Sequence, residues 1–380
     1  MRATRAIIHL DNLSQNISRI KKAVHEKVTV CIPVKADAYG HGAIPVAKTA
    51  LEAGADCLAV ATADEGIELR KAGIDCIILV LGIGLPEEIP LIVGYGLTPM
   101  ITDREVVAAL QLESALQGRR TSCHLKVDTG MGRIGCLPEE AADLAAEICR
   151  NRNLVLSGTA THLSVSDSPL QDDEHYTTTQ LARFTQALEH IRAAGIDPGL
   201  VHASNSGAII SRPDAHFDMI RPGILVYGYQ PSADCPTRIP VTPVMELETR
   251  LVSVRSLRAG SAVSYGRTWV AGQDTVIGTL PIGYADGLHR NLSPGLKVEI
   301  CGDTYPVVGR ICMDQCMVDL GPHSRIKRWE KVTIFGPGLV SASDVARVAG
   351  TIPYEITCAI NNRRVPRVYT GTPAYTAEKR

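Results

Sequence analysis

Short apolar runs alternate with amphipathic stretches over the first part of the chain. Where apolar residues recur at helical spacing, the pattern predicts helices at 11–24, 44–51, 64–71, 104–116, 138–149 and 175–193, the last of them opening after three acidic residues at 172–174. The apolar runs between them predict strands at 28–34, 56–60, 76–81, 97–101, 123–127, 154–161, 200–203 and 217–220. Eight such units in about 220 residues favour a (β/α)8 barrel over a doubly wound sheet.

The pattern changes after 230–240, a stretch rich in Pro, Ser, Asp and Thr that is typical of a linker. Beyond it, short alternating runs punctuated by Gly and Pro predict strands at 241–254, 261–265, 275–280, 296–301, 305–308, 317–320 and 331–335, with one helix at 343–348. A chain of 380 residues is long enough for two domains. We therefore expect a barrel domain over 1–235 and a β-rich domain over 236–380.

Composition and charge argue against several classes of function. The formal net charge is −1 and no basic run stands out, which argues against a nucleic-acid partner or a membrane surface. No apolar run approaches the roughly 20 residues of a membrane span. The N-terminus is too quickly polar for a signal peptide. The eleven cysteines are scattered without a C-x-x-C pair, which favours reduced thiols in a cytoplasmic enzyme and predicts no metal site.

Lys35 follows the first predicted strand and precedes a turn framed by Gly40 and Gly42, with Tyr39 and His41 in the same turn. An amine at the end of a buried strand is partly desolvated, which disfavours its charged form and prepares it to form a Schiff base or to take up a proton. A solvated lysine that merely caps a strand is the commoner situation. The two glycines favour the chemical role, because they let backbone approach a ligand closely.

Polar side chains recur after several of the predicted barrel strands. In a (β/α)8 barrel the active site lies where strands end and the following loops begin. A single histidine or arginine at such a place is more often structural, whereas clusters after five strands favour a functional rim. The residues are Lys35 after the first strand, Lys126, Asp128 and Arg133 after the fifth, His162 after the sixth, His202, Asn205 and Ser206 after the seventh, and Arg221 and Gly223 after the eighth.

The segment 128–135, DTGMGRIG, contains a G-x-G-x-x-G pattern between a strand and a helix. A dinucleotide site also needs an acidic residue at the end of the following strand. The strand at 154–161 offers none, and the segment follows the fifth strand rather than the first of a unit. We interpret it instead as a loop that brings Arg133 to a substrate carboxylate, which a guanidinium binds through two parallel hydrogen bonds.

Two short motifs, Asn-Ser-Gly at 205–207 and Arg-Pro-Gly-Ile at 221–224, fall where barrels often bind phosphate, in the loops after the seventh and eighth strands. A serine hydroxyl and unobstructed glycine amides can donate hydrogen bonds to phosphate. Each motif alone could be an ordinary turn, and their joint position favours phosphate. In the second domain Tyr265, the segment 309–315 and the Pro-Tyr-Glu at 353–355 are ambiguous in isolation. A tyrosine beside a glycine usually packs, and 353–355 could be a simple turn.

As a set, these segments resemble alanine racemase, a family of fold-type III enzymes that depend on pyridoxal 5'-phosphate (PLP). The matching pieces run in family order from end to end of the chain and agree with the family's barrel and β domain. They are VKADAYGHG at 34–42, KVDTGMGRIG at 126–135, THLSVSD at 161–167, HASNSG at 202–207, RPGILVYG at 221–228, VSYGRTW at 263–269, PIGYADG at 281–287, GRICMDQ at 309–315 and PYEI at 353–356.

The resemblance implies racemisation of alanine by two bases on opposite faces of the substrate. Lys35 would carry PLP as a Schiff base and act as one base, and Tyr265 would be the other. In the family this tyrosine comes from the partner subunit, so a homodimer with a shared active site is expected. Arg221 would face the pyridine nitrogen of PLP and leave it unprotonated, which limits side reactions. His202 would support Arg221, and His162 would help tune Tyr265.

The family also implies roles for the remaining residues. Lys126 is expected to be carbamylated, as in many members, and to orient Arg133. The ring of Tyr354 should favour alanine over serine moderately, since one atom in a pocket discriminates by about 1–3 kcal/mol. PLP would be held by Tyr39, Asn205, Ser206, Arg221, Gly223, Ile224 and Tyr354. The substrate carboxylate would meet Arg133 and the backbone of Met313, with Tyr265, Cys312 and Asp314 lining the same region.

Other functions within the fold type stay open at this point. A racemase with broader or serine specificity shares the same residues. A related decarboxylase is disfavoured by Arg221 and Tyr265, and a lone-barrel PLP-binding protein is disfavoured by the second domain. D-Alanine supply for peptidoglycan precursors and alanine catabolism are both compatible with the sequence.

Overall fold

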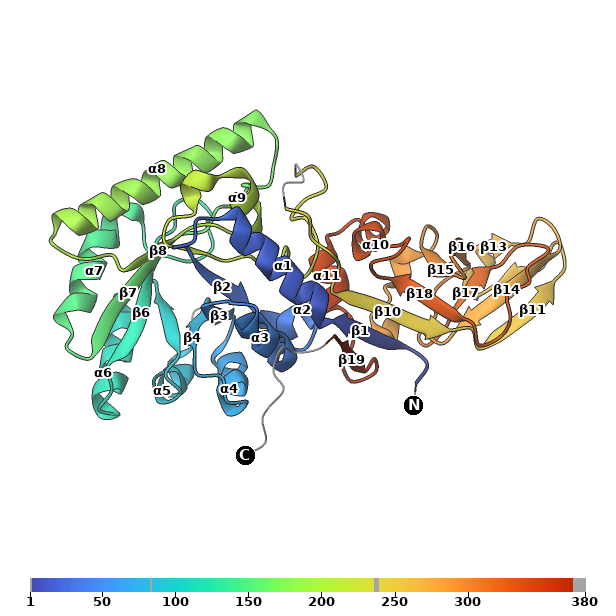
Figure 1. The fold of residues 1–380 in the computed structure, drawn as a ribbon, viewed down its shortest axis with the longest axis horizontal. Coiled ribbons are helices and arrows are strands. Elements are labelled where there is room, and N and C mark those ends of the chain that lie inside the picture. The colour runs from blue at the N-terminus through green and yellow to red at the C-terminus, as the bar shows by residue number, and fades with distance from the viewer. Residues whose placement is uncertain (1, 83, 236–238, 372–380) are drawn as a thin grey trace.

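The computed structural model describes residues 2–82, 84–235 and 239–371. A barrel of strands and helices forms one end of the molecule and a β-rich domain forms the other (Figure 1). Part of the predicted linker, 236–238, lies outside the described residues. No helix in the described part of the chain is both long enough and apolar enough to cross a bilayer.

Within the described ranges, eight parallel strands form one sheet in the order β8-β7-β6-β5-β4-β3-β2-β9. The backbone of Asp218 donates to Val201 O (3.0 Å) and that of Arg221 to Ser204 O (3.0 Å), which joins the two ends of the sheet into a nearly closed barrel. The predicted barrel is confirmed, and every predicted strand overlaps one in the structure. The strands are β2 (Thr29–Pro33), β3 (Cys57–Val60), β4 (Ile77–Val80), β5 (Thr98–Ile101), β6 (Thr121–Lys126), β7 (Leu154–Ala160), β8 (Leu200–His202) and β9 (Met219–Ile220).

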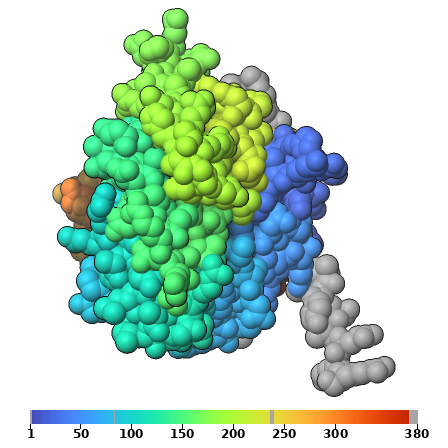
Figure 2. Space-filling view, turned by 90° about the vertical axis from the view of Figure 1, so that its left-hand side faces the viewer, coloured from blue at the N-terminus to red at the C-terminus, as the bar shows by residue number. Residues whose placement is uncertain are grey.

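Helices follow most of the barrel strands and cover their outer side (Figure 1). Figure 2 shows the barrel end of the molecule, where the surface runs from blue to yellow-green along the chain. Helix α8 begins at Gln171, four residues before its predicted start. The acidic residues 172–174 therefore lie in its first turn, where negative charge stabilises the helix N-terminus. The helices are α1 (Leu10–Ala23), α3 (Ala43–Glu52), α4 (Ala63–Lys71), α5 (Ile89–Gly94), α6 (Arg104–Leu116), α7 (Ala141–Arg150), α8 (Gln171–Ala193) and α9 (Ser206–Ser211), with short 3₁₀ turns at Pro86–Glu88, Pro138–Glu140 and Pro213–Ala215.

The barrel interior is filled by small and sulfur-containing side chains. One buried cluster comprises Cys31, Cys57, Ala59, Leu79, Met100, Ala160 and Met219. A second, larger cluster lies between the strands and the surrounding helices and continues into the C-terminal domain. The interior cluster forms a closed floor, so a ligand can enter only from the rim where the strands end.

The C-terminal domain is built on a nine-stranded sheet in the order β11-β14-β17-β16-β15-β18-β10-β1-β19. Its strands are β1 (Arg5–His9), β10 (Met245–Arg250), β11 (Ser253–Leu257), β14 (Thr275–Leu280), β15 (Lys297–Ile300), β16 (Asp303–Val308), β17 (Cys316–Asp319), β18 (Lys331–Phe335) and β19 (Arg367–Thr370). A separate ribbon pairs β12 (Ala262–Val263) with β13 (Trp269–Val270). The domain also holds α10 (Ala342–Ala349), α11 (Pro353–Cys358) and 3₁₀ turns at Tyr265–Arg267, Tyr284–Asp286 and Arg290–Leu292.

Both ends of the described chain enter this second sheet. Strand β1 pairs antiparallel with β10 and parallel with β19, an arrangement that the sequence pattern did not predict. One local prediction was wrong. The run 241–254 forms two strands, because the chain turns between β10 and β11. The Pro-Tyr-Glu at 353–355, which was ambiguous in the sequence, opens helix α11, with the proline at the first helical position, where its missing N–H costs nothing.

Candidate active site

A cavity of about 460 Å³ lies at the rim where the barrel strands end, a size typical of small-molecule sites. Met100 and Ala160 of the interior cluster line its floor. Much of the predicted site lies in its wall. The predicted residues that line it are Lys35, Tyr39, Lys126, Arg133, His162, Asn205, Ser206, Arg221, Gly223 and Tyr354.

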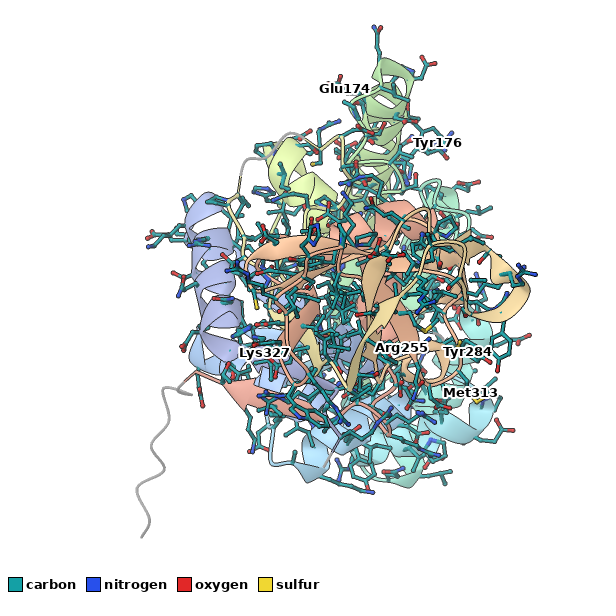
Figure 3. The ribbon with its side chains drawn as sticks, turned by 90° about the vertical axis from the view of Figure 1, so that its right-hand side faces the viewer. Glu174, Tyr176, Arg255, Tyr284, Met313 and Lys327 are labelled. Atoms are coloured by element: carbon teal, nitrogen blue, oxygen red, sulfur yellow. The ribbon has the colours of Figure 1, made fainter. Side chains whose placement is uncertain are left out.

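The other predicted residues lie elsewhere. His202 is buried beneath Arg221, and the side chain of Ile224 is buried in the core. Tyr265, Cys312, Met313 and Asp314 belong to the C-terminal domain, and none of them lines the cavity. Tyr265 is 70% exposed and Met313 is 52% exposed. Figure 3 shows Met313 at the surface near Tyr284. Within the described residues, one chain therefore does not bring Lys35 and Tyr265 into one cavity.

Lys35 begins a left-handed turn. Strand β2 ends at Pro33, and the short helix α2 (Lys35–Gly40) contains residues 36–39 with φ between 52° and 55°. None of the four is glycine, and the left-handed conformation costs about 1–2 kcal/mol for each such residue. Hydrogen bonds offset part of this cost, from Ala38 N to Val34 O (2.8 Å) and from Ala36 N to Glu65 Oε1 (2.7 Å). Strain that persists in this way is typical of functional sites.

The environment of Lys35 favours its neutral form. Burial lowers the pKa of the Lys35 amine, the cations of Arg133 and Arg221 lower it further, and Glu65 acts in the opposite direction. A larger fraction of the amine is therefore unprotonated near neutral pH than for a solvated lysine. An amine in this state can attack a carbonyl or accept a proton.

Arg221 anchors the centre of the cavity. It is 6% exposed, and its Nη2 donates to Thr161 O (2.9 Å) and Ala203 O (3.0 Å), while Nη1 donates to His202 Nδ1. Burial lowers the pKa of Arg221 to about 10, so it stays protonated near neutral pH. Arg221 therefore offers a fixed cation and hydrogen-bond donors, and it cannot accept a proton from a ligand.

His124 continues this network and was not predicted. Because Arg221 only donates, His202 Nδ1 must accept, and its Nε2 then donates to His124 Nδ1 (2.8 Å). Burial, assisted by Arg221, lowers the pKa of His202 well below its usual value and that of His124 to about 4, so both rings are neutral. Gly158 leaves room for the His124 ring, since a Cβ there would lie 2.6 Å from its Cε1. His124 could have been found from its place two residues before Lys126 on β6, on the same face of the strand.

His162 lies in the cavity wall beside Arg221. Its Nδ1 is 3.3 Å from Arg221 Nη2. Burial lowers the pKa of His162 well below its usual value, and the cation of Arg221 adds to this. His162 is therefore a neutral ring that accepts a hydrogen bond from the arginine near neutral pH.

One end of the cavity is a cradle of donors. Ser206 Oγ accepts from Gly223 N (2.9 Å), and a Cβ on Gly223 would lie 3.0 Å from the Tyr39 hydroxyl oxygen. The Tyr39 ring is 5.9 Å from that of Tyr354, and burial raises the pKa of both phenols, which keeps them protonated. Asn205 caps α9 by accepting from Ala208 N (3.1 Å). Hydroxyl and amide donors around a bare glycine suit an anionic group such as phosphate.

The other side of the cavity carries Lys126 and Arg133. Lys126 is 6% exposed, and its Nζ donates to Val127 O (3.0 Å). Burial, with the cation of Arg221 next in effect, lowers the pKa of Lys126 to about 7. Asp128 Oδ1 accepts from Gly130 N (2.9 Å) and Gly132 N (3.1 Å) and so shapes the loop that carries Arg133 into the cavity.

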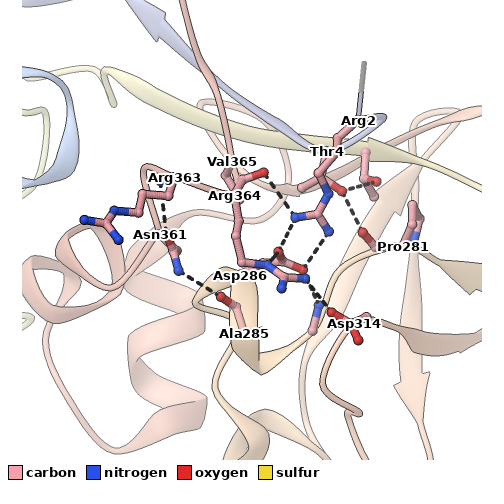
Figure 4. Close-up of polar contacts among 12 residues, drawn as sticks. Arg2, Thr4, Pro281, Ala285, Asp286, Asp314, Asn361, Arg363, Arg364 and Val365 are labelled. Atoms are coloured by element: carbon pink, nitrogen blue, oxygen red, sulfur yellow. Dashed lines mark hydrogen bonds and ion pairs between the residues drawn. The ribbon is translucent and has the colours of Figure 1, made fainter.

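The predicted residues of the C-terminal domain form a separate surface group. The amides of Tyr284 and Ala285 donate to Cys312 O (3.1 Å) and Met313 O (3.0 Å). Figure 4 shows how the neighbouring loop is fixed, with the buried Asp286 accepting from Arg2 and Arg364, and Arg364 also pairing with Asp314. These bonds hold the loop that carries Cys312, Met313 and Asp314, while the side chains of Tyr265 and Met313 stay largely exposed.

Comparison with known proteins matches both halves of the chain. The family model described as "Alanine racemase, N-terminal domain" matches residues 8–231, and that described as "Alanine racemase, C-terminal domain" matches residues 244–369. Curated alanine racemases of Treponema denticola and Treponema pallidum are 50% and 47% identical over 97% of this chain, covering 98% and 100% of the relatives.

Solved structures agree in fold and sequence. An alanine racemase of Clostridium difficile superposes with a TM-score of 0.92 at 37% identity, covering 97% of this chain and 96% of that one. The enzyme of the D-cycloserine producer Streptomyces lavendulae has a TM-score of 0.92 at 33% identity, covering 98% of both chains. The resemblance seen in the sequence motifs is thereby confirmed, and the chain belongs to the alanine racemase family of isomerases.

Proposed function

We propose that this chain interconverts L- and D-alanine with PLP as cofactor, and that it works as a homodimer with Lys35 and Tyr265 as its two bases. The observation that carries this proposal is the cavity itself. It combines an amine whose pKa is lowered by burial, a fixed cation and an anion cradle, which are the groups that an aldehyde, a pyridine nitrogen and a phosphate require. The donor set therefore fits PLP. When bound, PLP withdraws electrons from the α-carbon of an amino acid and makes its proton acidic.

The phosphate of PLP would be held at the cradle by Ser206, Gly223, Tyr39 and Tyr354. The backbone of Ile224 would contribute from the same loop. Arg221 would face the pyridine nitrogen, and its protonated state supports the hypothesis that this nitrogen carries no proton. His202 and His124 would keep Arg221 in place through the donor order described above. Arg133 would bind the substrate carboxylate, for which a planar guanidinium is suited.

Lys35 would hold the cofactor and move a proton on one face of the substrate. The second face needs another proton carrier, and the described residues in the cavity wall offer no tyrosine other than Tyr39 and Tyr354 at the cradle. Tyr265 is 70% exposed and lies outside the cavity of its own chain. These facts support a dimer in which each C-terminal domain supplies Tyr265, with Met313, Cys312 and Asp314, to the cavity of the partner.

The domain roles follow from this proposal. Residues 1–235 would form the PLP-binding barrel, and residues 236–380 would supply the tyrosine base. Most of the described cysteines are free thiols, among them Cys31, Cys57, Cys123 and Cys316. That state supports a reducing compartment such as the cytoplasm.

A direct test is incubation of the PLP-loaded protein with L-alanine in deuterated water. Loss of circular dichroism and exchange of the α-proton, followed by proton NMR, should occur together. The same assay with L-serine and with basic amino acids separates a broader racemase from a decarboxylase, which would release carbon dioxide. Absence of α-proton exchange with alanine in protein that has bound PLP would refute the proposed reaction.

We further propose that Lys126 is carbamylated. A carbamate forms from the neutral amine, and a pKa of about 7 means that the neutral fraction rises as the pH rises through 7. The product is an anion beside Arg133 that would orient its guanidinium, a charge-assisted hydrogen bond worth about 1.5–3 kcal/mol. Protein equilibrated with carbon-13-labelled bicarbonate should show a carbamate resonance that grows above pH 7.

The variant Lys126→Met should lose this resonance and raise the KM for alanine by about tenfold or more, as expected for losing such a bond. The exposed Lys48, changed to methionine, serves as the control and should leave both the resonance and KM unchanged. An unmodified Lys126 amine in fully active protein contradicts the carbamate.

A further inference from the structure

Arg367 of strand β19 forms hydrogen bonds, from outside the barrel, with the turn that carries Lys35. Its Nε and Nη2 both donate to the carbonyl of Gly40, at 3.0 and 2.9 Å. Nη2 also donates to Ile360 O (2.7 Å), and Nη1 donates to Val365 O (2.8 Å). One guanidinium thus ties the end of the left-handed turn to two carbonyls of the C-terminal segment.

Arg367 is held in place because β19 is a strand of the nine-stranded sheet, in which Arg367 pairs with Ala6 of β1. The turn has glycines, Gly40 and Gly42, where α11 and β19 pack against it. A side chain on Gly40 would collide with Thr357 O, and one on Gly42 would collide with the Tyr369 hydroxyl. Both glycines also have positive φ, at 82° and 96°. The turn is therefore pressed against α11 and β19 along its last residues.

Bonds within the barrel hold other parts of the turn. Glu65 accepts from Ala36 N near its start, and the Asp37 carboxylate accepts from Ala43 N (2.8 Å) beyond its end. The Gly40 carbonyl between these points is taken by Arg367. Four left-handed residues lower their conformational energy by relaxing to the ordinary conformation. The bonds of Arg367 to Gly40 O therefore add a restraint from the C-terminal segment to the backbone bonds that close the turn, from His41 N to Ala38 O (3.1 Å) and from Gly42 N to Asp37 O (2.9 Å).

We propose that Arg367 is a positioning residue for Lys35, which fixes the strained turn and thereby the direction in which the amine enters the cavity. It contacts neither cavity nor reacting atoms and acts through the Gly40 carbonyl. A guanidinium is required, because its nitrogens reach three carbonyls in one plane, whereas an ammonium has one nitrogen. The proposal rests on the proposed function only in that Lys35 is the reactive amine.

The test uses the full-length chain freed of PLP and the variant Arg367→Lys. Lys35 is labelled with an amine-acylating reagent across a pH series and quantified by peptide mass spectrometry, with the exposed Lys48 as internal reference. A loosened turn exposes the amine to water, which raises the pKa of Lys35 toward its usual value. We expect at least about threefold less labelling of Lys35 at neutral pH, and PLP binding about tenfold weaker, than in the natural protein. The exposed Arg363, changed to lysine, is the matched control and should behave as the natural protein.

A folded Arg367→Lys protein with unchanged Lys35 labelling overturns the inference. Should that variant fail to fold, Arg367→Gln keeps a planar donor and is measured in the same way. Failure of both to fold also overturns it, since Arg367 would then support the whole domain rather than the turn. The labelling requires no PLP and no alanine. Failure of the proposed function would appear separately, as natural protein that does not bind PLP or exchange the α-proton.

Discussion

Replacement of Lys35 by alanine is expected to abolish racemisation and the visible absorbance that bound PLP gives the protein. The amine has two tasks in the proposed reaction, since it holds the cofactor and moves a proton. Loss of a general base alone slows a reaction by about 10²–10⁴-fold, and loss of the covalent anchor adds to that. We therefore expect a decrease in kcat of at least about 10⁴-fold. The measurement is α-proton exchange of alanine in deuterated water at saturating PLP.

Two controls make this result specific. The exposed Lys48, changed to alanine, should retain full activity. Added methylamine should restore part of the activity of Lys35→Ala, because a small free amine can replace the missing base in the space left by the side chain. A Lys35→Ala protein that keeps both its colour and its activity would show that another amine, with Lys126 the nearest candidate in the cavity wall, reacts with PLP.

The fold brings several positively charged side chains close to Lys35, and they affect the pKa of its amine. Lys35, Lys126, Arg133 and Arg221 all line one cavity, where Asp167 is the carboxylate among the described lining residues. Burial lowers the pKa of both lysines, and the cations of Arg133 and Arg221 act in the same direction. Burying several cations together is unfavourable in free energy unless anions pair with them. A phosphate and a substrate carboxylate would supply them, and a carbamate on Lys126 would remove one cation. Ligand binding and catalytic readiness are therefore linked through the same charges.

The sequence pattern predicted the barrel because each of its strands is a short buried run that can be recognised from the local sequence. Each apolar run between helices is complete in itself, so that 154–161 or 123–127 could be recognised without knowledge of their partners. The polar residues after these runs then gathered at one rim because parallel strands end on the same side. For the same reason Lys35, Arg133 and Arg221, which are far apart in the sequence, could be placed in one cavity.

The features that were missed depend on distant partners or on backbone conformation. Strands β1 and β19 are short, and their partners lie far away in the sequence, since β1 pairs with both β10 and β19. The left-handed turn at 36–39 consists of residues with ordinary preferences, so it depends on tertiary contacts such as those of Gly40 with α11 and β19 and that of Ala36 with Glu65. The start of helix α11 stayed ambiguous in the sequence, because Pro-Tyr-Glu can begin a helix or a turn. These elements together position Lys35 and Tyr354. The exact positions of the site residues therefore depend on tertiary contacts that the local sequence does not reveal.

Tyr265 provides the second large effect and a test of the shared active site. Tyr265→Ala should remove the proton carrier of one substrate face, with a loss of about 10²–10⁴-fold in both directions of racemisation. Bound PLP should keep its visible absorbance, because Lys35 is intact. Tyr95→Ala is a suitable control, since Tyr95 is 36% exposed at the end of α5 and lines neither the cavity nor the surface around Tyr265. It should lose far less activity and none of the absorbance.

Mixing the two inactive variants distinguishes a shared site from a site within one chain. In a dimer of Lys35→Ala with Tyr265→Ala, one cavity has Lys35 from one chain and Tyr265 from the other, and the second cavity lacks both. Random pairing after co-refolding makes half of the dimers mixed, so about a quarter of natural activity should return if each cavity is completed by its partner. If Lys35 and Tyr265 acted within one chain, no mixed dimer would contain a complete site and activity would stay at the level of the separate variants. The exposed position of Tyr265, outside a cavity that holds Lys35, predicts the first result.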